Sequence, residues 1–382
     1  MASEEVAETM TAPSGLRGSQ DTFATGPAAP STRVPADRRW AAWALPVAAL
    51  WSAGELVAGI AWLRGSGGNP AVPRAGETSG LSVLDLAGPT AGAAALAGAG
   101  ALGLAVVVAM LVQRRRGGSA AARRVVAGVA VTLGLVLALV LPDYRLLAWV
   151  AYLPIIAVMT VAGTMPDGVQ VWPWPVVHMA LATVGGIAFL VAAREYVRLA
   201  APCTACGRGT GGFAAWAVRH ARWAVGVAVA VPVGYAMTRL AWAFGIPFGI
   251  SRQMLDDISD IAVLGAGLAA LGIGGAVLTL GLVQRWGEVF PRWIPGARGR
   301  RVPPALAIVP ASVVSLLVTS AGLMLLRFWL DGTLGDAVPG GDANVAAWLP
   351  EMLWPLWGAA LALATYAYAV RRREPCGRCG SR

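Results

Sequence analysis

The 382-residue sequence contains no lysine, only two histidines and few charged residues of any kind. Charged side chains make up 13% of the chain, whereas soluble globular domains contain about 25%. Hydrophobic residues make up 57%, and several apolar runs reach the roughly 20 residues that cross a bilayer as a helix. The alternating segments typical of a membrane β-barrel are missing from the sequence. The composition therefore predicts an all-α, polytopic integral membrane protein.

All thirty basic residues are arginine, and the net charge is +10. Such a surplus can bind phosphate or nucleic acid, or it can reflect the positive cytoplasmic loops of membrane proteins. The second interpretation is favoured because the arginines cluster in alternate loops, and no nucleic-acid partner is expected. The sequence has no Walker loop, no Ser-His-Asp pattern and no His-Glu-x-x-His motif. It gives no positive indication of an enzyme.

Residues 1–37 are rich in Ala, Ser, Thr, Pro, Gly and Glu and lack the apolar core of a signal peptide. This composition predicts a disordered cytoplasmic tail. Eight membrane-spanning helices are predicted near residues 40–63, 90–112, 125–141, 174–193, 216–245, 261–283, 304–326 and 349–370. A further apolar stretch, residues 146–163, is short and contains Pro154.

The arginines decide whether residues 146–163 cross the membrane. With eight spans and a cytoplasmic N-terminus, 24 arginines lie on the cytoplasmic side and five on the outer side. If the extra stretch also crossed, 11 would lie inside and 18 outside, against the positive-inside rule. We therefore expect an interfacial or re-entrant segment on the outer side of a plasma membrane, with both termini in the cytoplasm.

Six short motifs recur in the same order in the two halves of the chain. One is the sequence Leu-Val-Gln-Arg, which stands at residues 111–114 and again at 282–285. Each set of motifs ends in Cys-x-x-Cys-Gly. The order predicts a duplication, with membrane repeats at residues 38–212 and 213–382 that each contain four helices. Because four is even, the repeats share one orientation and are related by an axis along the membrane normal.

The chain has four cysteines, and all of them belong to these two motifs: Cys203, Cys206, Cys376 and Cys379. Two Cys-x-x-Cys turns supply the four thiolates of a tetrahedral structural zinc site. The reducing cytosol argues against disulfides. We therefore expect a zinc ion that clips the two repeats together on the cytoplasmic side. A thiol-redox pair, two unligated pairs and an iron–sulfur cluster remain as alternatives.

Two charged residues are predicted to lie within spans, Glu55 in the first and Arg239 in the fifth. A charge in a span costs about 2.5–3.5 kcal/mol on insertion scales and needs a partner or water. The two positions are equivalent in the two repeats and similar in depth. They therefore predict an ion pair across the repeat interface, which is either a structural bridge or the polar lining of a route for a substrate or protons.

Further polar residues are expected around the outer mouth of the protein. A lone histidine near a helix end is more often hydrogen-bonded than a ligand. The acidic run at residues 256–260 could bind a cation, although it is not a complete calcium loop and is most simply a solvated loop. The candidates are Asp143, Tyr144, Arg145, His178, Asp256, Asp257, Asp260 and Glu351.

Four stretches are similar to a known group of proteins: Trp174–Val177, Cys203–Gly207, Thr238–Pro247 and Leu282–Pro295. They resemble uncharacterised actinobacterial multi-pass membrane proteins with two CxxCG motifs. The resemblance extends over nearly the whole chain outside the N-terminal tail. It implies a membrane location and an actinobacterial origin, and it brings neither an activity nor any site residue.

Three functions are compatible with these features. The first is binding or translocation of a small molecule at a polar site between the repeats, near Glu55 and Arg239. The second is a membrane scaffold or sensor whose arginine-rich cytoplasmic face docks a protein partner or anionic lipid. The third is a thiol oxidoreductase. The first is favoured, and bilayer lipid is the one partner that the sequence identifies.

Overall fold

The computed structural model describes residues 42–72, 80–165, 170–198, 212–337, 344–373 and 376. The predicted N-terminal tail lies outside them. Within the described residues, nine helices are long and apolar enough to cross a membrane, and the remaining regular structure is short helices and one isolated bridge. The predicted class, an all-α polytopic membrane protein, is confirmed.

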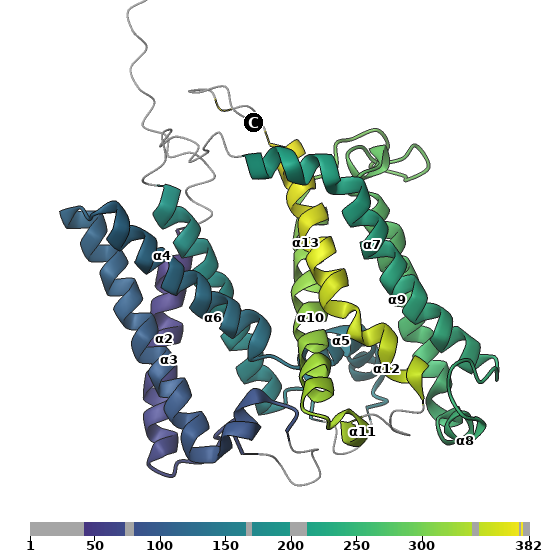
Figure 1. The fold of residues 1–382 in the computed structure, drawn as a ribbon. Helices are drawn as coiled ribbons and strands as arrows, with labels where there is room; N and C mark the ends of the chain where they lie inside the picture. Colours follow the sequence, from purple (N-terminus) through teal and green to yellow (C-terminus); the bar gives the residue numbers. More distant parts are fainter. Residues whose placement is uncertain are drawn as a thin grey trace, which may run out of the picture.

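Figure 1 shows the long helices in two groups that stand side by side. The first half contains α2 (Ala44–Leu63), α3 (Val83–Arg116), α4 (Ala120–Leu135) with the π-helix η1 (Val136–Val140), and α6 (Trp174–Arg198). The second half contains α7 (Gly212–Ala243), α9 (Ala262–Leu280), α10 (Pro304–Leu330) and α13 (Trp354–Arg371). The shorter helices are α8 (Arg252–Asp257), η2 (Ser259–Ile261), η3 (Arg285–Gly287), α11 (Leu334–Ala337) and α12 (Val345–Met352).

The two halves pack their helices in the same order. In the first half α3 packs on α2, α2 on α6, and α6 on α4. In the second half α9 packs on α7, α7 on α13, and α13 on α10. Each half thus has the spatial order second, first, fourth, third when its long helices are numbered along the chain. A duplication would produce this shared order, and the duplication itself stays a prediction.

One end of the bundle carries most of the described arginines. Helices α3, α6, α9 and α13 end there, and α4, α7 and α10 begin there, at the top of Figure 1. The clusters at this end include Arg114–Arg116, residues 285–301 and Arg371–Arg373, and we call it the basic end. Since α6 and α13 both finish at the basic end, the segments that follow them, which carry the cysteine pairs, both leave from that end.

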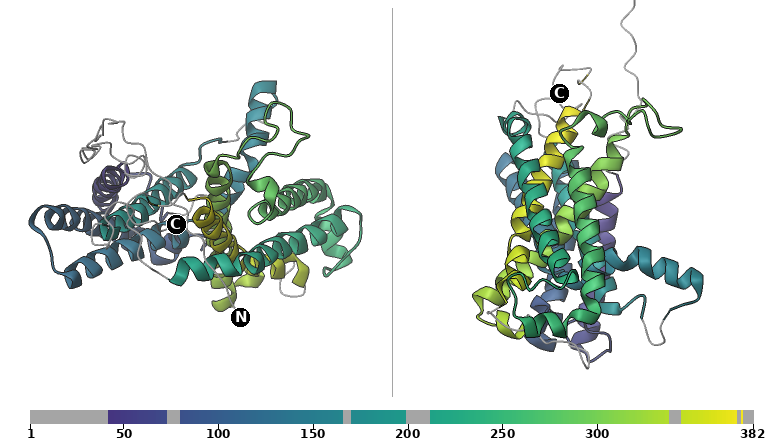
Figure 2. Two further views of the ribbon diagram at one scale, coloured as in Figure 1. Left: turned by 90° about the horizontal axis from the view of Figure 1, so that it is seen from above. Right: turned by 90° about the vertical axis from the view of Figure 1, so that its right-hand side faces the viewer.

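The predicted non-crossing segment is α5 (Tyr144–Ala162), and it differs from the other long helices in direction. Figure 2 shows it projecting sideways from the bundle, across the other long helices and away from the basic end. The Asp143 Oδ1 atom caps its start by accepting a hydrogen bond from the Arg145 backbone N–H at 2.9 Å. Gly163 ends it in a left-handed conformation with φ 68°. By composition α5 could cross a membrane, and its interfacial or re-entrant placement stays a prediction.

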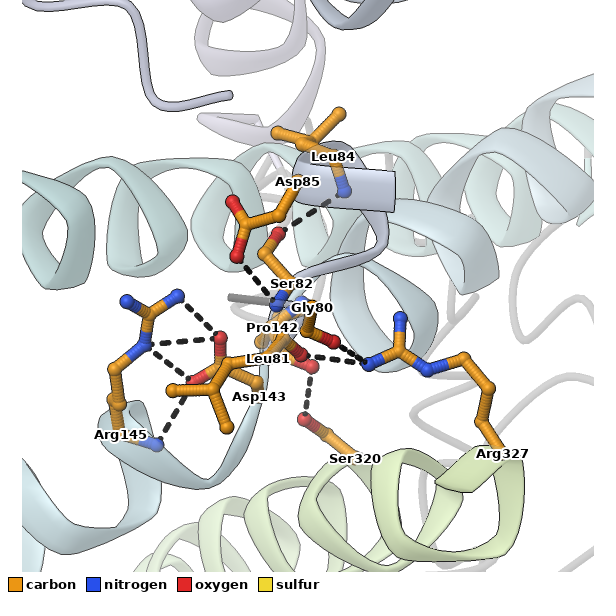
Figure 3. Close-up of polar contacts among 10 residues, drawn as sticks. All are labelled: Gly80, Leu81, Ser82, Leu84, Asp85, Pro142, Asp143, Arg145, Ser320 and Arg327. Atoms are coloured by element: carbon orange, nitrogen blue, oxygen red, sulfur yellow. Dashed lines mark hydrogen bonds and ion pairs between the residues drawn. The ribbon is translucent and has the colours of Figure 1, made fainter. Parts of the chain in front are cut away.

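The two halves are joined through α10, at the end opposite the basic end (Figure 3). The Arg327 Nη2 atom donates hydrogen bonds to the carbonyls of Gly80 and Leu81 at 2.6 and 2.8 Å. The Ser320 hydroxyl donates to the carbonyl of Pro142 at 2.9 Å. Leu317 of the same helix enters the buried core of the first half. One helix therefore ties the second half to two separate loops of the first.

The turn whose carbonyls accept hydrogen bonds from Arg327 is itself fixed by a capping box at the start of α3. Ser82 accepts a hydrogen bond from the Leu84 N–H at 3.2 Å, and the Asp85 carboxylate accepts one from the Ser82 N–H at 3.0 Å (Figure 3). These bonds satisfy backbone donors that every helix start leaves open. The carbonyls of Gly80 and Leu81 are thus held in place for the arginine.

Glycine allows α2 and α3 to approach closely in the first half. A Cβ atom at Gly100 would lie 2.5 Å from the backbone nitrogen of Leu56, and one at Gly103 would overlap the Ser52 hydroxyl. Gly98 of the same helix faces open space, with nothing within 4 Å of an added Cβ. Small residues at such interfaces let helix backbones pack in membranes.

We expect Gly100→Ala to destabilise the protein and Gly98→Ala to leave it unchanged or slightly more stable. Alanine gains about 1 kcal/mol of helix propensity over glycine at either site, but overpacking costs about 1–3 kcal/mol where no space exists. Thermal unfolding of the purified protein, followed by circular dichroism, measures both. A Gly100→Ala variant that melts above the Gly98→Ala variant would contradict the close helix contact.

Candidate functional site

The side chain of Arg239 lies near the end of α7, clamped between two aromatic rings. Its Cζ atom is 4.6 Å from the ring centroid of Tyr235 and 4.3 Å from that of Trp242. Positions three and four residues apart share one face of a helix, so the local sequence of α7 builds this stack by itself. Both contacts are within the range of cation–π attraction.

The charge of Arg239 is neutralised by Glu351 of α12. The Arg239 Nη2 atom lies 2.6 Å from Glu351 Oε1, and the side chains are only 12% and 18% exposed. The carbonyl oxygens of Ala346 and Ala347 accept longer hydrogen bonds from the same guanidinium, at 3.5 and 3.4 Å. The arginine therefore contacts both the carboxylate and the backbone of α12.

The position of α12 results from a break in the last predicted span. The helix stops at Met352 and α13 begins at Trp354, so that α12 turns away from α13 over the end of α7 (Figure 1). Its start is anchored to the turn after α7. The Ala346 N–H donates to the Gly249 carbonyl at 3.0 Å, and the Asn344 side chain accepts from the Ser251 N–H at 2.8 Å.

Arg239 and Glu351 stand in the wall of a cavity of about 600 Å³. Most of its lining comes from α7, α9, α10 and α12 of the second half, but Leu81, Tyr144 and Tyr152 come from the first half and α5. The walls are largely apolar and aromatic, with one ion pair and tyrosine hydroxyls as the polar groups. A concave apolar pocket with a few convergent polar groups is the usual form of a small-molecule site.

Glu55 does not pair with Arg239, and the predicted ion pair between them is wrong. The Glu55 Oε1 atom lies 3.0 Å from His178 Nε2, and the two side chains are 6% and 4% exposed. The ring of His178 also packs against Trp62 and Trp174, with centroids 5.8 and 6.1 Å away. Glu55 lies on α2, which packs on α3 and α6 of its own half, so its partner comes from α6.

Each half thus contains its own charged or polar pair, between its first long helix and the start of its last. In the first half the acid is on α2 and its partner on α6; in the second half the base is on α7 and the acid just before α13. The pair Glu55–His178 is buried beside the rings of Trp62 and Trp174. The pair Arg239–Glu351 faces a cavity, which makes the second half the better candidate for binding.

The other predicted outer-mouth residues divide into structural and solvated groups. Asp143 caps α5 and forms an ion pair with Arg145, with 2.7 Å between Oδ2 and Nη2 (Figure 3). Asp256 and Asp257 end the short helix α8 and Asp260 lies in η2, so the predicted loop is helical, and all three residues are exposed. Among the residues that the structure describes, no three His, Cys, Asp or Glu side chains converge in a way that could hold a metal ion.

Sequence reasoning missed the partner of Arg239 and the aromatic walls of the cavity. Glu351 was expected only as one of several acids near the outer mouth, and Tyr235 and Tyr152 were not singled out. The spacing of Tyr235, Arg239 and Trp242 along one helix face was a usable signal. The break at Leu353, which brings Glu351 over Arg239, lies between Pro350 and Pro355, and these prolines were a usable signal for a helix interruption.

Three of the four predicted zinc ligands, Cys203, Cys206 and Cys379, lie outside the described residues; Cys376 is described. The chain segments next to the two pairs lie close together. The rings of Phe213 and Tyr366 have centroids 5.5 Å apart, and Ala217 and Ala221 of α7 pack with Ala367 of α13.

No family model, no curated protein and no solved structure matches the chain. The resemblance to actinobacterial membrane proteins therefore stays a prediction.

We expect Arg239→Gln and Glu351→Gln each to destabilise the protein. The double variant should lose less stability than the sum of the two single losses. Removing one member of a buried ion pair leaves the other unpaired, at a cost of up to about 3–5 kcal/mol. Thermal unfolding of the three variants in one detergent gives the coupling between them. Asp256→Asn, which removes an exposed charge, is the control, and strictly additive losses would mean that the two side chains do not interact.

Proposed function

We propose that the protein is a plasma-membrane binding protein for a small amphipathic molecule with an acidic head group. The cavity of Arg239 and Glu351 would be its site. The observation that carries the proposal is a buried arginine, stacked between Tyr235 and Trp242, in the wall of a cavity of about 600 Å³. Arginine presents a planar fork of donors that suits carboxylates and phosphates.

The acidic head would bind by competing with Glu351 for the guanidinium of Arg239. In the ligand-free protein Glu351 neutralises this charge, which lowers the free-energy cost of placing Arg239 in an apolar environment. The rings of Tyr235, Trp242 and Trp354, with apolar residues of α9 and α10, would hold the apolar part of the ligand. Because Glu351 is carried by the short helix α12, exchange of its partner would couple binding to the position of α12.

The same proposal includes an orientation in the membrane. The basic end would face the cytoplasm, in keeping with the positive-inside rule. The cavity of Arg239 would then lie in the outer half of the bilayer, and α5 would lie along the outer surface beside it. Tyr144 and Tyr152 of α5, which line the cavity, would stand between the ligand and the lipid or water outside. Transport across the membrane would be a further property of the same site.

We expect oleate to bind the protein about tenfold more tightly than oleyl alcohol, and oleylamine to bind no better than the alcohol. The three probes share one tail and differ in head-group charge, and a tenfold ratio corresponds to about 1.4 kcal/mol. That is the size of a hydrogen bond to a charged group. Equilibrium binding of each radiolabelled probe to protein in phosphatidylcholine nanodiscs, with empty nanodiscs subtracted, measures the ratio.

The variant Arg239→Gln should remove the preference for oleate, and Arg252→Gln should keep it. Arg252 is exposed and lies at the same end of the bundle, so the control makes the same change of charge without touching the cavity. Equal binding of acid and alcohol to the natural protein, or an equal effect of the two substitutions, would exclude an acid-binding site at Arg239.

A second part of the proposal is the zinc clip formed by the two cysteine pairs. It is supported by the common end from which both segments leave and by the contacts between α7 and α13 beside them. Four thiolates would bind zinc tetrahedrally and hold the last helices of the two halves together. In this role the metal is structural and takes no part in binding at Arg239.

Metal analysis of the purified full chain should find about one zinc ion per molecule, as a four-thiolate site requires. Replacing either pair, Cys203→Ser with Cys206→Ser or Cys376→Ser with Cys379→Ser, should lower the content to near zero, because two thiolates do not complete the site. Zinc that survives loss of one pair would rule out shared ligation. Zinc-free protein whose thiols cycle with oxidant would instead support a thiol oxidoreductase.

A further inference from the structure

A second cavity, of about 670 Å³, lies at the basic end of the second half. Its walls come from α9, α10 and α13, and its roof is the connection between α9 and α10, residues 281–303, which we call the inner loop. The lining is almost entirely apolar and includes Trp286, Phe290 and Trp293 of the inner loop. The volume is within the range of about 300–1,000 Å³ that small-molecule sites occupy.

The inner loop is folded as a hairpin and is fastened to α13. The Phe290 N–H donates to the Arg300 carbonyl, and the Val302 N–H donates to the Glu288 carbonyl, both at 3.0 Å. The Tyr368 hydroxyl of α13 donates to the Gly287 carbonyl at 2.7 Å. Arg372 Nη2 donates to the Val302 carbonyl at 2.6 Å. The roof of the cavity is therefore held in place by the protein itself.

The inner loop turns its aromatic side chains toward the cavity and its charges outward. All five of its arginines are exposed, and Glu288 is its one acidic residue. The arginines are Arg285, Arg292, Arg298, Arg300 and Arg301. None of the five lines the cavity, but all belong to the loop that roofs it. Exposed guanidinium groups on the roof of an apolar cavity are complementary to a molecule with an anionic head and an apolar tail.

The cavity opens toward the apolar outer faces of α9 and α10, where a bilayer would lie. Leu278 and Leu306, which line it, are 69% and 59% exposed, and Trp293 at its edge is 80% exposed. Large exposed apolar side chains on spanning helices are covered by lipid, and tryptophan favours the membrane–water interface. Figure 2 shows the inner loop and α5 projecting from the same side of the molecule, at opposite ends. The positions of the inner loop and of α5 along the bundle fit the two surfaces of one bilayer.

We propose that this cavity is a binding site for an anionic phospholipid of the cytoplasmic leaflet. One acyl chain occupies the space between α9 and α10, and the phosphate group contacts the arginines of the inner loop. The lateral opening and the apolar walls fit a lipid chain that enters from the bilayer. The arginines distinguish an anionic lipid from a zwitterionic one, because juxtamembrane basic residues attract acidic head groups.

This site is separate from the cavity of Arg239. The two cavities lie at opposite ends of α9, one beside residues 261–268 and the other beside residues 275–282. They share no lining residue. Loss of lipid binding at the inner loop would therefore say nothing about acid binding at Arg239. Loss of acid binding at Arg239 would likewise say nothing about lipid binding at the inner loop.

The test is lipid retention by the purified full chain, measured by native mass spectrometry. The protein is loaded with phosphatidylglycerol or with phosphatidylcholine of the same acyl chains and is then washed in detergent. We expect one phosphatidylglycerol to be retained per chain, at least tenfold more than phosphatidylcholine. Equal retention of the two lipids, or none of either, would overturn the proposal.

Two variants with matched controls separate the tail from the head group. Ala311→Phe fills the cavity and should lower retention about tenfold, whereas Ala305→Phe, at an exposed position of α10 outside the lining, should not. Changing Arg292, Arg298 and Arg300 together to Gln should remove the preference for phosphatidylglycerol. The same change at Arg114, Arg115 and Arg116, which are also exposed at the basic end, should keep it.

The arginine variant keeps the test decisive if Ala311→Phe fails to fold, because the changed side chains are exposed. An unchanged preference for phosphatidylglycerol in that variant means that the inner loop does not distinguish the two head groups. A preference lost equally in both arginine variants means that the lipid responds to the charge of the whole basic end. Either result overturns a specific site at the inner loop.

Discussion

The cost of leaving a charge unpaired in an apolar environment constrains both halves of this protein. A buried ion needs a partner of opposite charge or a hydrogen-bonding group. In the first half Glu55 meets this need with His178, and in the second half Arg239 meets it with Glu351. Each pair joins the first long helix of its half to the start of the last. The pairs therefore help set where the helices of each half lie, and they leave α10 to connect the halves.

The two halves share one helix order but differ in what their helices enclose. In the first half, glycines such as Gly100 let backbones meet, and the pair Glu55–His178 is enclosed by Trp62 and Trp174. In the second half, α9 and α10 line two cavities, one beside Arg239 and one beneath the inner loop. The two halves therefore differ in what their shared helix order encloses: a buried polar pair in the first and two cavities in the second.

The sequence predicted the all-α, polytopic membrane class and singled out the segment of α5, because hydropathy and arginine placement report on whole segments. Among the described residues nine helices, α5 included, are long and apolar enough to cross, so the predicted number of eight spans stays a prediction. The sequence also identified Arg239. It predicted the wrong partner, because equivalent depth in two helices says nothing about the directions in which their side chains face. The true partner depends on the break at Leu353, which turns α12 over α7. Pro350 and Pro355 mark this break in the sequence, but the direction in which α12 turns depends on the tertiary contacts of Ala346 and Asn344, which cannot be read from local pattern.

The two cavities are bordered by the same two helices, and this has a mechanical consequence. Both have α9 on one side and α10 on the other, at opposite ends of these helices, although they share no lining residue. Because a helix moves as a rigid element, a chain that fixes the spacing between α9 and α10 at the basic end would bear on their spacing at the other end as well. Lipid in the inner cavity would then act on the affinity of the outer one, and linkage requires the reverse effect to be equal. The helix α10 that would carry this coupling is also the one that Arg327 and Ser320 fasten to the first half, so the motion available to it is largely that of α9 moving against a fixed α10.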